Sequence, residues 1–531
     1  MFALYLVLAA MTATSLRAAP LEEKAGRLLM PTIDAAFVEA HAQEIRSGLL
    51  NAGMLAWDKH DATALRKLRR RLDALTGKNR RFLLAVDHEG GPLFTQRTAG
   101  LTIFPGNMAL GATGDEVLAR EAARISAQEL AALGIDMVFA PVADVNSDPL
   151  NPIVSIRAFS DSPEVVARFT EYAVKGYEDG GVIPVLKHFP GHGDTDTDSH
   201  TGLPLIEKSA AALEKSDLIP FKKAIAAGAQ AVMTAHIRVP SLGADEEPAT
   251  LSRAVMTRLL RGRYGFKGVL VSDSLEMAAV AKRYPPAKSA VLAVEAGCDL
   301  LLTGRADTHA IRRALAGKIA EKALDAAGAR IAALEKRPAD YSMKKLRPPS
   351  VALRDIADRS VTLLRDRPGL LPLKASAKGL LFVVFRSKGF AEEGTRFEAA
   401  TRKAFPGSKM IFLEPNPSKE AAAEAMRRAR EAGTLIVSSY HWGMKPIAAQ
   451  QTLIARMLQL GKPVVLISAM SPYDLLSYPE AQTAVLTYGF TAGSLEAAVR
   501  LLSGKIEPRG RLPVSLSGRL RRGDGLQNFV R

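Results

Sequence analysis

A dense group of ionisable side chains occupies residues 187–200, KHFPGHGDTDTDSH. Three histidines, three aspartates and a lysine follow directly after the apolar run 181–186, GVIPVL. An apolar run that ends in ionisable residues is typical of a buried strand whose carboxyl end faces a functional site. We therefore expect the function of the chain to depend on which of these groups does chemistry.

A metal site is the first interpretation of this segment. Asp194, Asp196 and Asp198 alternate as the ligands of a calcium loop do, but such a loop needs glycine at position 6 and glutamate at position 12. Those positions hold Ser199 and Leu205. A histidine-rich zinc site is a variant of this interpretation, but the HExxH spacing typical of a helix-borne zinc site is absent. The sequence therefore predicts no metal site.

Two other interpretations remain: a polar turn capped by its own carboxylates, and acid–base catalysis by a histidine that an aspartate orients. In an extended segment residues i and i+2 point to the same side, so Asp198 could accept a hydrogen bond from one ring nitrogen of His200. Such a bond would fix the tautomer and direct the other nitrogen toward a substrate. An unperturbed histidine side chain has a pKa of about 6.5, which suits proton transfer near neutral pH.

Asp273 follows a second apolar run, residues 268–272, and could supply a nucleophile. A nucleophilic aspartate and a separate proton donor are the minimal equipment of a retaining glycosidase. The alternative is a helix N-cap, because the helix-forming stretch 274–283 comes next. The residue type and its position alone leave both interpretations open.

Eight β-rich apolar runs must position these groups, and helical stretches such as 115–133 separate most of them. Strands that alternate with helices predict a parallel sheet, and eight units fit an N-terminal (β/α)8 TIM-like barrel. The runs are 28–33, 53–57, 82–87, 137–145, 182–189, 231–237, 268–273 and 299–304. Five of them end in ionisable residues, at Asp87-His88-Glu89, Asp144, Lys187-His188, His236 and Asp273. Active sites of such barrels lie at that end of the strands.

A second domain follows the barrel. We expect the catalytic barrel over 21–335, a charged, proline-containing linker over 336–350 and a C-terminal domain over 351–531. Five further runs that alternate with helices predict an open α/β sheet in an α/β/α sandwich. These runs are 379–385, 409–414, 433–439, 463–469 and 483–490. No GxGxxG motif follows the first of them, which argues against a dinucleotide cofactor.

The formal net charge of +16 raises the possibility of an anionic partner. The basic residues are spread along the chain, and the densest cluster, 66–71, is spaced like a solvated helix face without interleaved aromatic residues. We therefore expect no nucleic-acid partner, whereas association with an anionic cell wall fits the charge. The single cysteine, Cys298, excludes an intramolecular disulfide and is expected in the core.

Residues 1–20, MFALYLVLAAMTATSLRAAP, have the length and the small-residue ending of a signal peptide, although a positive amino-terminal region is missing. The apolar stretch is too short to span a bilayer, and no later segment reaches transmembrane length. These features predict export to the periplasm or the outside of the cell. The alternative is a buried N-terminal helix in a cytoplasmic protein.

The segment 187–200, together with SDSLEM at 272–277, resembles glycoside hydrolase family 3, and specifically its bacterial β-N-acetylglucosaminidase branch. That branch carries a D-S-H signature, here 198–200, in place of a carboxylic acid as proton donor. Further similarity lies in DHEGG (87–91), FPGNMALGA (104–112), FAPVADVN (139–146), VSIRAFSD (154–161), GFKGVLVSDSLEM (265–277), RSVTLLRD (359–366) and GKIEPRGRLPVSL (504–516). The motifs cover both expected domains.

The resemblance implies a role for each candidate residue. Asp273 would be the nucleophile, His200 the general acid and then the general base, and Asp198 the residue that orients His200. The hydroxyls of an N-acetylglucosamine ring would be held by Asp87, Arg157, Lys187 and His188. The family usually has an arginine soon after D-x-E-G-G; here Arg97 comes about two residues later than that pattern and could reach the sugar through a longer loop.

The activity implied is that of a retaining exo-β-N-acetylglucosaminidase without metal or cofactor. Its substrates would be glycans that end in β-linked N-acetylglucosamine, such as peptidoglycan fragments or chitooligosaccharides. A β-glucosidase or β-xylosidase of the same family and a β-N-acetylglucosaminide phosphorylase are the enzymatic alternatives. A catalytically silent wall-binding protein would be expected to lack the nucleophile or the acid–base pair, and both are present here. The C-terminal domain would be structural or would recognise polymer.

Overall fold

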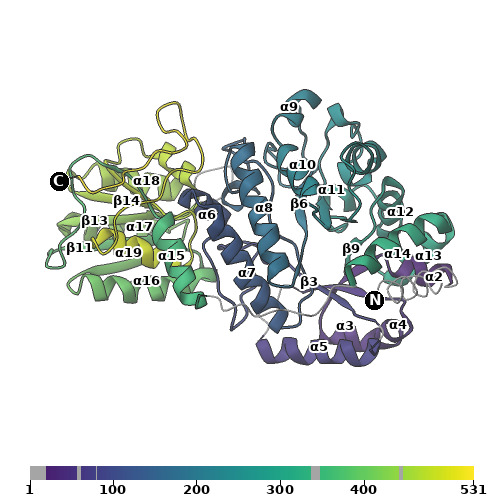
Figure 1. The fold of residues 1–531 in the computed structure, drawn as a ribbon. Coiled ribbons are helices and arrows are strands. Elements are labelled where there is room, and N and C mark those ends of the chain that lie inside the picture. The colour runs from purple at the N-terminus through teal and green to yellow at the C-terminus, as the bar shows by residue number, and fades with distance from the viewer. Residues whose placement is uncertain (1–19, 57–60, 79, 336–346, 442–446, 531) are drawn as a thin grey trace.

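The computed structural model describes residues 20–56, 61–78, 80–335, 347–441 and 447–530. The predicted signal segment 1–20 therefore lies almost wholly outside the described residues, as does most of the predicted linker. Figure 1 shows two domains side by side, the N-terminal one in purple to green and the C-terminal one in green to yellow. Within the described part of the chain, no helix is both long enough and apolar enough to span a membrane.

The N-terminal domain is a barrel of parallel strands. The strands are β1 (Leu29–Ile33), β2 (Ala52–Leu55), β3 (Leu83–Val86), β4 (Met137–Val138), β5 (Ile183–Pro184), β6 (Leu186–Phe189), β7 (Ala231–Thr234), β8 (Val269–Val271) and β9 (Leu301–Gly304). They pair in the orders β5-β4-β3-β2-β1-β9 and β6-β7-β8. Bridges between Val142 and Lys187 and between Val271 and Leu300 join the two sheets into a ring.

The predicted (β/α)8 barrel is thus confirmed, and each of the eight apolar runs contains a strand. The run 182–189 holds two short strands, β5 and β6, on either side of Val185. Most strand residues are fully buried, which explains why the runs are continuously apolar rather than alternating.

An outer ring of helices covers the barrel (Figure 1). The α-helices are α2 (Leu21–Gly26), α3 (Ala35–Ala40), α4 (Ala42–Ser47), α5 (Ala62–Thr76), α6 (Asn107–Thr113), α7 (Glu116–Ala132), α8 (Pro163–Asp179), α9 (Ala210–Glu214), α10 (Ile219–Ala226), α11 (Ala278–Ala281), α12 (Pro286–Ala296), α13 (Thr308–Lys318) and α14 (Glu321–Glu335). Local signals set their starts: Asp115 caps α7 by accepting from the Val117 N–H, and Ser162 caps α8, which has Pro163 in its first turn.

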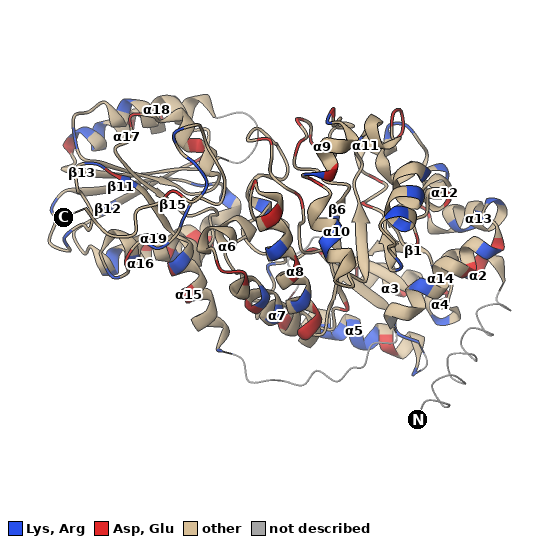
Figure 2. Cartoon of the chain, turned by 45° about the horizontal axis from the view of Figure 1, so that its top comes forward, with Lys and Arg blue, Asp and Glu red and all other residues tan. Residues whose placement is uncertain are grey.

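The C-terminal domain is a sandwich around one six-stranded sheet. Its strands are β10 (Thr362–Asp366), β11 (Leu380–Phe385), β12 (Lys409–Leu413), β13 (Thr434–Ser439), β14 (Val464–Ser468) and β15 (Thr483–Leu486), in the order β10-β15-β14-β13-β11-β12. Helices α15 (Pro349–Ser360), α16 (Ala391–Ala404) and α19 (Ala492–Leu502) cover one face, and α17 (Lys419–Glu431) and α18 (Ala448–Leu458) cover the other (Figure 2).

The five predicted parallel strands of this domain are present, and the sequence analysis missed a sixth. Strand β10 pairs antiparallel with β15, so it does not belong to the alternating strand–helix pattern that revealed the others. It follows α15 directly and carries the polar Arg365 and Asp366. Helix α14 ends at Glu335 and α15 begins at Pro349, so the last residues of the predicted linker are helical.

The two domains share apolar and polar contacts. Helix α15 packs on α6 and α7, and Met108 and Ala109 of α6 belong to the buried cluster of the C-terminal domain. On the polar side, Asp161 of the barrel accepts from the Arg522 guanidinium at 2.6 Å and from the Ser515 N–H at 2.7 Å. The C-terminal domain therefore holds the loops that follow the carboxyl end of β4.

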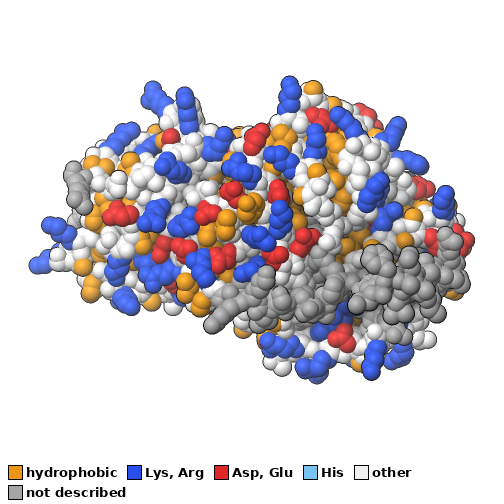
Figure 3. All heavy atoms as spheres, in the orientation of Figure 1, with side chains coloured by type: hydrophobic (Ala, Val, Ile, Leu, Met, Phe, Trp, Pro, Cys, Tyr) orange, Lys and Arg blue, Asp and Glu red, His pale blue; other side chains and the backbone are white. Residues whose placement is uncertain are grey.

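Charged side chains are distributed over both domains. Figure 3 shows lysines and arginines scattered over the visible face, with aspartates and glutamates between them. Cys298 is buried in the barrel, as expected for its apolar neighbourhood.

Candidate active site

Two cations and two carboxylates meet at the carboxyl ends of β3 and β6. The Lys187 ammonium contacts Asp87 Oδ1 at 2.7 Å and Glu89 Oε1 at 2.6 Å. Arg157, in the 3-10 helix Ser155–Arg157, donates to both oxygens of Glu89 at 2.8 Å. The structure therefore joins Asp87, Arg157 and Lys187, which lie far apart in the sequence, through Glu89.

The charges in this cluster control each other. Burial alone would raise the pKa of Glu89, but the adjacent charges of Arg157 and Lys187 lower it to about 2. For Asp87, burial outweighs Lys187 and raises the pKa. Ionised, the four groups sum to zero charge, so they can remain buried and still present hydrogen-bonding atoms to a polar ligand.

His188 is oriented by a buried carboxylate. Its Nδ1–H donates to Asp144 Oδ2 at 2.7 Å, and its backbone N–H donates to the other oxygen at 3.2 Å. Burial would raise the pKa of Asp144, but His188 lowers it to about 2. Nε2 of His188 lies 3.4 Å from the Arg157 guanidinium, so His188 belongs to the same cluster. Asp144 was visible in the sequence only as an ionisable strand end.

The Asp198–His200 contact that the spacing predicts is present. Nδ1 of His200 donates to Asp198 Oδ1 at 2.8 Å, and the same oxygen accepts the His200 backbone N–H at 2.9 Å. The backbone forms a turn rather than the extended segment we expected, because the N–H groups of Thr201 and Gly202 donate to the Asp198 carbonyl. The hydrogen bond that His200 donates to Asp198 raises the pKa of His200, and the charge of Asp273 acts in the same direction. The His200 side chain is 47% exposed.

Asp273 follows β8 and is not a helix N-cap. Helix α11 begins at Ala278 with Met277 as its N-cap, and the Asp273 carboxylate accepts instead from the adjacent Ser274 N–H at 2.7 Å. Burial would raise the pKa of Asp273, but His236, His188 and the Ser274 N–H lower it. Asp273 is therefore an ionised carboxylate that interacts electrostatically with His188 and His200.

His236, which lies after the end of β7, contacts the backbone next to this carboxylate. Its ring is buried between Thr250 Oγ1, at 2.8 Å, and the Ser274 carbonyl, at 2.9 Å. Burial lowers the pKa of His236, and the charge of Asp273 acts in the opposite direction. His236 holds the backbone that follows Asp273.

The residues in the middle of the segment 187–200 stabilise the loop between β6 and His200. The ring of His192 lies between Thr195 Oγ1, at 2.8 Å, and Ser199 Oγ, at 3.0 Å, and burial lowers its pKa to about 4. Gly193 is required because a Cβ there would lie 1.7 Å from the Val145 carbonyl oxygen. The loop is tied to the segment after Asp273, since the Lys282 ammonium donates to the Thr201 carbonyl at 2.9 Å.

Arg97, the remaining predicted site residue, contacts the C-terminal domain. It forms an ion pair with Glu393 of the C-terminal domain, and its guanidinium lies 4.7 Å from the centre of the Phe390 ring. The longer loop after DHEGG carries this side chain to the domain interface, and its contacts give no support to the expected sugar contact. Phe94 of the same loop, which the sequence did not single out, lies over Arg157 and beside His200.

Comparison with known proteins identifies the family. The model of the glycosyl hydrolase family 3 N terminal domain matches residues 20–334, and that of the family 3 C-terminal domain matches residues 361–524. The chain belongs to glycosyl hydrolase family 3. The two matches together cover both domains of the structure, in the order in which they fold.

Relatives of this family 3 hydrolase extend over most of its length. It is 31% identical to beta-hexosaminidase A of Pseudoalteromonas piscicida, over 82% of this chain and 83% of the relative. It is 30% identical to a beta-N-acetylglucosaminidase/beta-glucosidase of Cellulomonas fimi, over 81% and 83%. A solved family 3 beta-N-acetylglucosaminidase of Paenibacillus sp. str. FPU-7 superposes with a TM-score of 0.85 at 32% identity, over 94% of this chain and 99% of that one. A beta-glucoside phosphorylase with a TM-score of 0.82 is only 23% identical and shares the fold.

An open hollow of about 500 Å³ adjoins His200 in this hydrolase. Its lining includes Ser274, Glu276, Met277 and Lys282. The hollow thus lies between His200 and the segment after Asp273.

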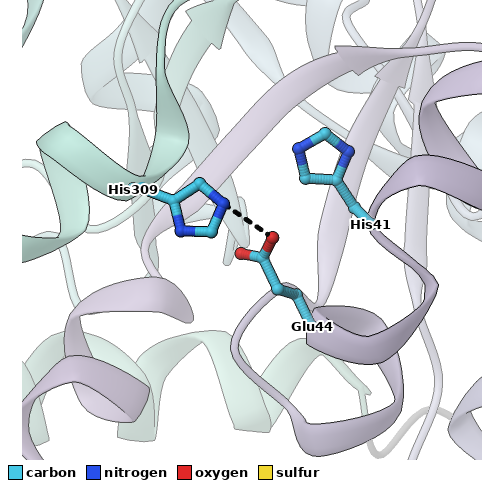
Figure 4. A group of neighbouring side chains, drawn as sticks. All are labelled: His41, Glu44 and His309. Carbon is cyan, nitrogen blue, oxygen red and sulfur yellow. Dashed lines mark ion pairs between the residues drawn. The ribbon is translucent and has the colours of Figure 1, made fainter.

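A group of metal-type ligands lies away from these residues, where α3 and α4 meet α13. One ligand atom each from His41, Glu44 and His309 lies within 4.8 Å of the others (Figure 4). Arg312 donates to Glu44 Oε2 at 2.6 Å and to His309 Nδ1 at 3.0 Å. A guanidinium can only donate, so Nδ1 is the acceptor and the proton of a neutral His309 sits on Nε2, which points to Glu44. The group is therefore held together by Arg312 and hydrogen bonds. A metal ion would have to displace the Nε2 proton of His309 and bind next to the positive charge of Arg312.

Proposed function

We propose that this family 3 hydrolase is a retaining exo-β-N-acetylglucosaminidase that forms a covalent glycosyl-aspartate. Relatives named for beta-hexosaminidase and beta-N-acetylglucosaminidase activity support hydrolysis of β-linked N-acetylglucosamine. The observation that carries the mechanism is the 2.8 Å bond between His200 and Asp198, beside an ionised carboxylate at the end of β8. This arrangement supports a proton donor and a nucleophile as separate groups on two loops.

The first step forms the glycosyl-enzyme. The Asp273 carboxylate attacks the anomeric carbon, the bond from that carbon to the glycosidic oxygen breaks, and protonated His200 gives its Nε2 proton to the leaving oxygen. Asp198 keeps Nδ1 protonated and stabilises the imidazolium beforehand. The second step reverses these roles: neutral His200 takes a proton from water, whose oxygen displaces Asp273 from the anomeric carbon.

Asp87, Arg157, Lys187 and His188 hold the sugar in this proposal. Their support is a buried network whose geometry exists before a ligand arrives, because Glu89 and Asp144 fix both cations and the imidazole. A rigid network of charged donors and acceptors places the hydroxyls of a sugar ring with little entropy left to lose. The leaving group would then extend into the hollow beside His200.

The natural substrates in this proposal are peptidoglycan fragments or chitooligosaccharides, met outside the cytoplasm. Export rests on the composition of residues 1–20, and attraction to an anionic wall rests on the net charge of +16. A phosphorylase is the second candidate, because a histidine donor repels an incoming phosphate less than a carboxylate donor would.

Hydrolysis of 4-nitrophenyl N-acetyl-β-D-glucosaminide, compared with that of the 4-nitrophenyl β-D-glucoside, tests the substrate. The N-acetylated compound should be cleaved faster and should release N-acetylglucosamine with its β configuration retained. Faster cleavage of the glucoside would overturn the assignment, and release of a sugar 1-phosphate in phosphate buffer would favour the phosphorylase.

Removing His200 tests the acid role. His200→Ala should slow cleavage of an N-acetylglucosamine disaccharide by about 100-fold or more, because its alkoxide leaving group needs a proton. The nitrophenyl substrate leaves without one and should lose much less in the first step. Equal losses on the two substrates would show that His200 is structural.

A further inference from the structure

Phe94 lies where three loops of the barrel face meet. It sits half-buried between β3 and α6, and its carbonyl accepts the Glu89 N–H at 3.0 Å. A bridge between His88 and Thr95 closes the same turn. The turn therefore fixes Phe94 close to Glu89, the residue that joins Arg157 and Lys187.

The Phe94 ring contacts both halves of the site. The Arg157 guanidinium lies 4.2 Å from the centre of the ring, within the range of a cation–π interaction. The His200 ring lies 6.1 Å away from it, at an interplanar angle of 23°. The ring also packs on a small apolar cluster, Ile153, Val154 and Ala158, which is separate from the cores of the two domains.

The backbone of Phe94 is unusual for a residue with a large side chain. Its φ is +46°, in the left-handed region that glycine adopts more easily. A position that needed only this turn would favour glycine or asparagine. A phenylalanine in this conformation indicates that the ring has a use at the site.

We propose that Phe94 is a positioning residue that couples the sugar-binding cluster to the proton donor. The inference rests on the proposed function and adds a residue that holds His200 in register with the sugar. His200 is half-exposed and bonded to Asp198 in its own turn, so a contact from another loop is needed to relate it to Arg157. Phe94 supplies that contact, since one rigid ring borders both side chains.

Three substitutions separate the ring from the turn. Phe94→Leu keeps apolar volume against Ile153 and Val154 but removes the ring, Phe94→Gly also relieves the backbone, and Phe94→Tyr keeps the ring. Loss of the ring should slow cleavage of an N-acetylglucosamine disaccharide by about tenfold, because proton donation by a misplaced His200 is impaired. The 4-nitrophenyl substrate should lose about threefold or less in kcat, with a rise in KM that is common to both substrates and reflects Arg157.

Phe37→Leu is the matched control. Phe37 is also half-buried and stacks on a histidine, His41, with ring centres 3.9 Å apart, but it lies in the α3–α4 region away from the site. This variant should leave both kcat values unchanged. Phe94→Tyr should stay within about threefold of the parent on both substrates, as expected for a retained ring.

The outcomes distinguish the role of Phe94 from the proposed function of the enzyme. Equal losses on the two substrates in Phe94→Leu and Phe94→Gly, or near-parental activity of Phe94→Gly, would overturn the role of the ring. A loss in Phe94→Tyr as large as in Phe94→Leu would do the same. Failure of the parent enzyme to cleave either N-acetylglucosaminide would instead overturn the proposed function, whatever the Phe94 variants do.

Discussion

The barrel and the C-terminal sandwich both contain parallel strands, yet their carboxyl ends differ in kind. In the barrel these ends carry Asp87, Lys187, His188 and Asp273, together with Asp144 beyond β4. In the sandwich three neighbouring strands carry hydroxyls there: Ser439 ends β13, Ser468 ends β14 and Thr487 follows β15, whereas Arg386 follows β11 and Glu414 follows β12. The Ser468 hydroxyl donates to the Ser471 carbonyl at 2.7 Å, and that of Thr487 to the Ala469 carbonyl at 3.1 Å. Parallel strand ends thus carry ionisable groups in the barrel, whereas the hydroxyls at the ends of β14 and β15 bond to carbonyls of their own loops.

The two domains also differ in how a buried carboxyl group is charged. Glu89 in the barrel has two cationic neighbours, which outweigh its burial and lower its pKa to about 2. Asp474 in the sandwich is equally enclosed and accepts a hydrogen bond from the neutral Ser439 hydroxyl at 2.7 Å, so burial raises its pKa to about 8. Burial without a compensating charge therefore yields a neutral acid at Asp474, whereas two neighbouring cations keep Glu89 ionised inside the protein.

The sandwich contributes to the site by holding barrel loops. Tyr473, adjacent to Asp474, accepts from the Asn146 amide at 3.0 Å, and Asn146 lies two residues beyond Asp144. Arg97 of the loop after β3 pairs with Glu393. The C-terminal domain thus supports two loops of the barrel face that carries Asp87 and Asp144.

The largest effect should come from the carboxylate after β8. Asp273→Ala removes the proposed nucleophile, so turnover of the 4-nitrophenyl N-acetylglucosaminide should fall by at least about 10⁴-fold with the fold intact. Steady-state assays and circular dichroism measure the two quantities. Asp474→Asn is the matched control, because it replaces a buried carboxyl near a strand end of the other sheet by an amide of the same shape.

That control should keep near-parental activity. If Asp474→Asn lost as much turnover as Asp273→Ala while remaining folded, chemistry would not be confined to the barrel. The contrast between the two domains would then be wrong.

An intermediate effect is expected from the partner of His200. Hydrogen bonding to Asp198 raises the pKa of His200, and the first step needs His200 protonated, so activity should fall as the pH rises through that pKa. Asp198→Asn removes the negative charge and should move the alkaline limb of kcat/KM to lower pH by roughly one unit. It should also reduce the maximum by at least about tenfold.

The pH profile is the deciding readout for Asp198. Asp194→Asn, in the same loop but bonded to Ser147 at 2.9 Å, is the control and should leave the limb in place. An unchanged limb in Asp198→Asn would mean that another group sets the alkaline pKa.

The sequence allowed prediction of most of the fold and of the chemical groups, because both leave local signals. Continuous apolar runs mark buried parallel strands, and their polar ends mark Asp87, Lys187 and Asp273. Antiparallel β10 breaks the strand–helix alternation and was missed. The two-residue spacing correctly predicted the contact between Asp198 and His200. The backbone that forms this contact is a turn and not the expected extended segment.

Contacts between loops could not be predicted in this way. The side chain of Arg97 turns to Glu393 because the loop after β3 packs on the other domain, and only the folded chain shows that. Glu89 and Asp144 each bond to residues more than 40 positions away. Phe94 gives no local sequence signal, since its neighbours Arg157 and His200 come from two other loops.

The smallest effect on activity, and a clear one on stability, should come from Asp474 itself. Its pKa is raised from 3.8 to about 8 in the folded protein. Between those values the unfolded chain releases a proton that the folded chain keeps, so the free energy of unfolding decreases as the pH rises from 4 to 8. The stabilising contribution of Asp474 is fully present below pH 4, and no further loss from this group occurs above its folded pKa.

Asp474→Asn replaces the neutral acid by a neutral amide and removes this dependence. Relative to the parent, the variant should gain stability between pH 4.5 and pH 8, by at least about 2 kcal/mol at the upper end. Urea unfolding of the full chain at several pH values measures the difference, and Asp245→Asn at an exposed barrel position is the control. If the free energy of unfolding changed with pH in the same way in parent and variant, Asp474 would be ionised at neutral pH. The proposed difference between Asp474 and Glu89 would then be wrong.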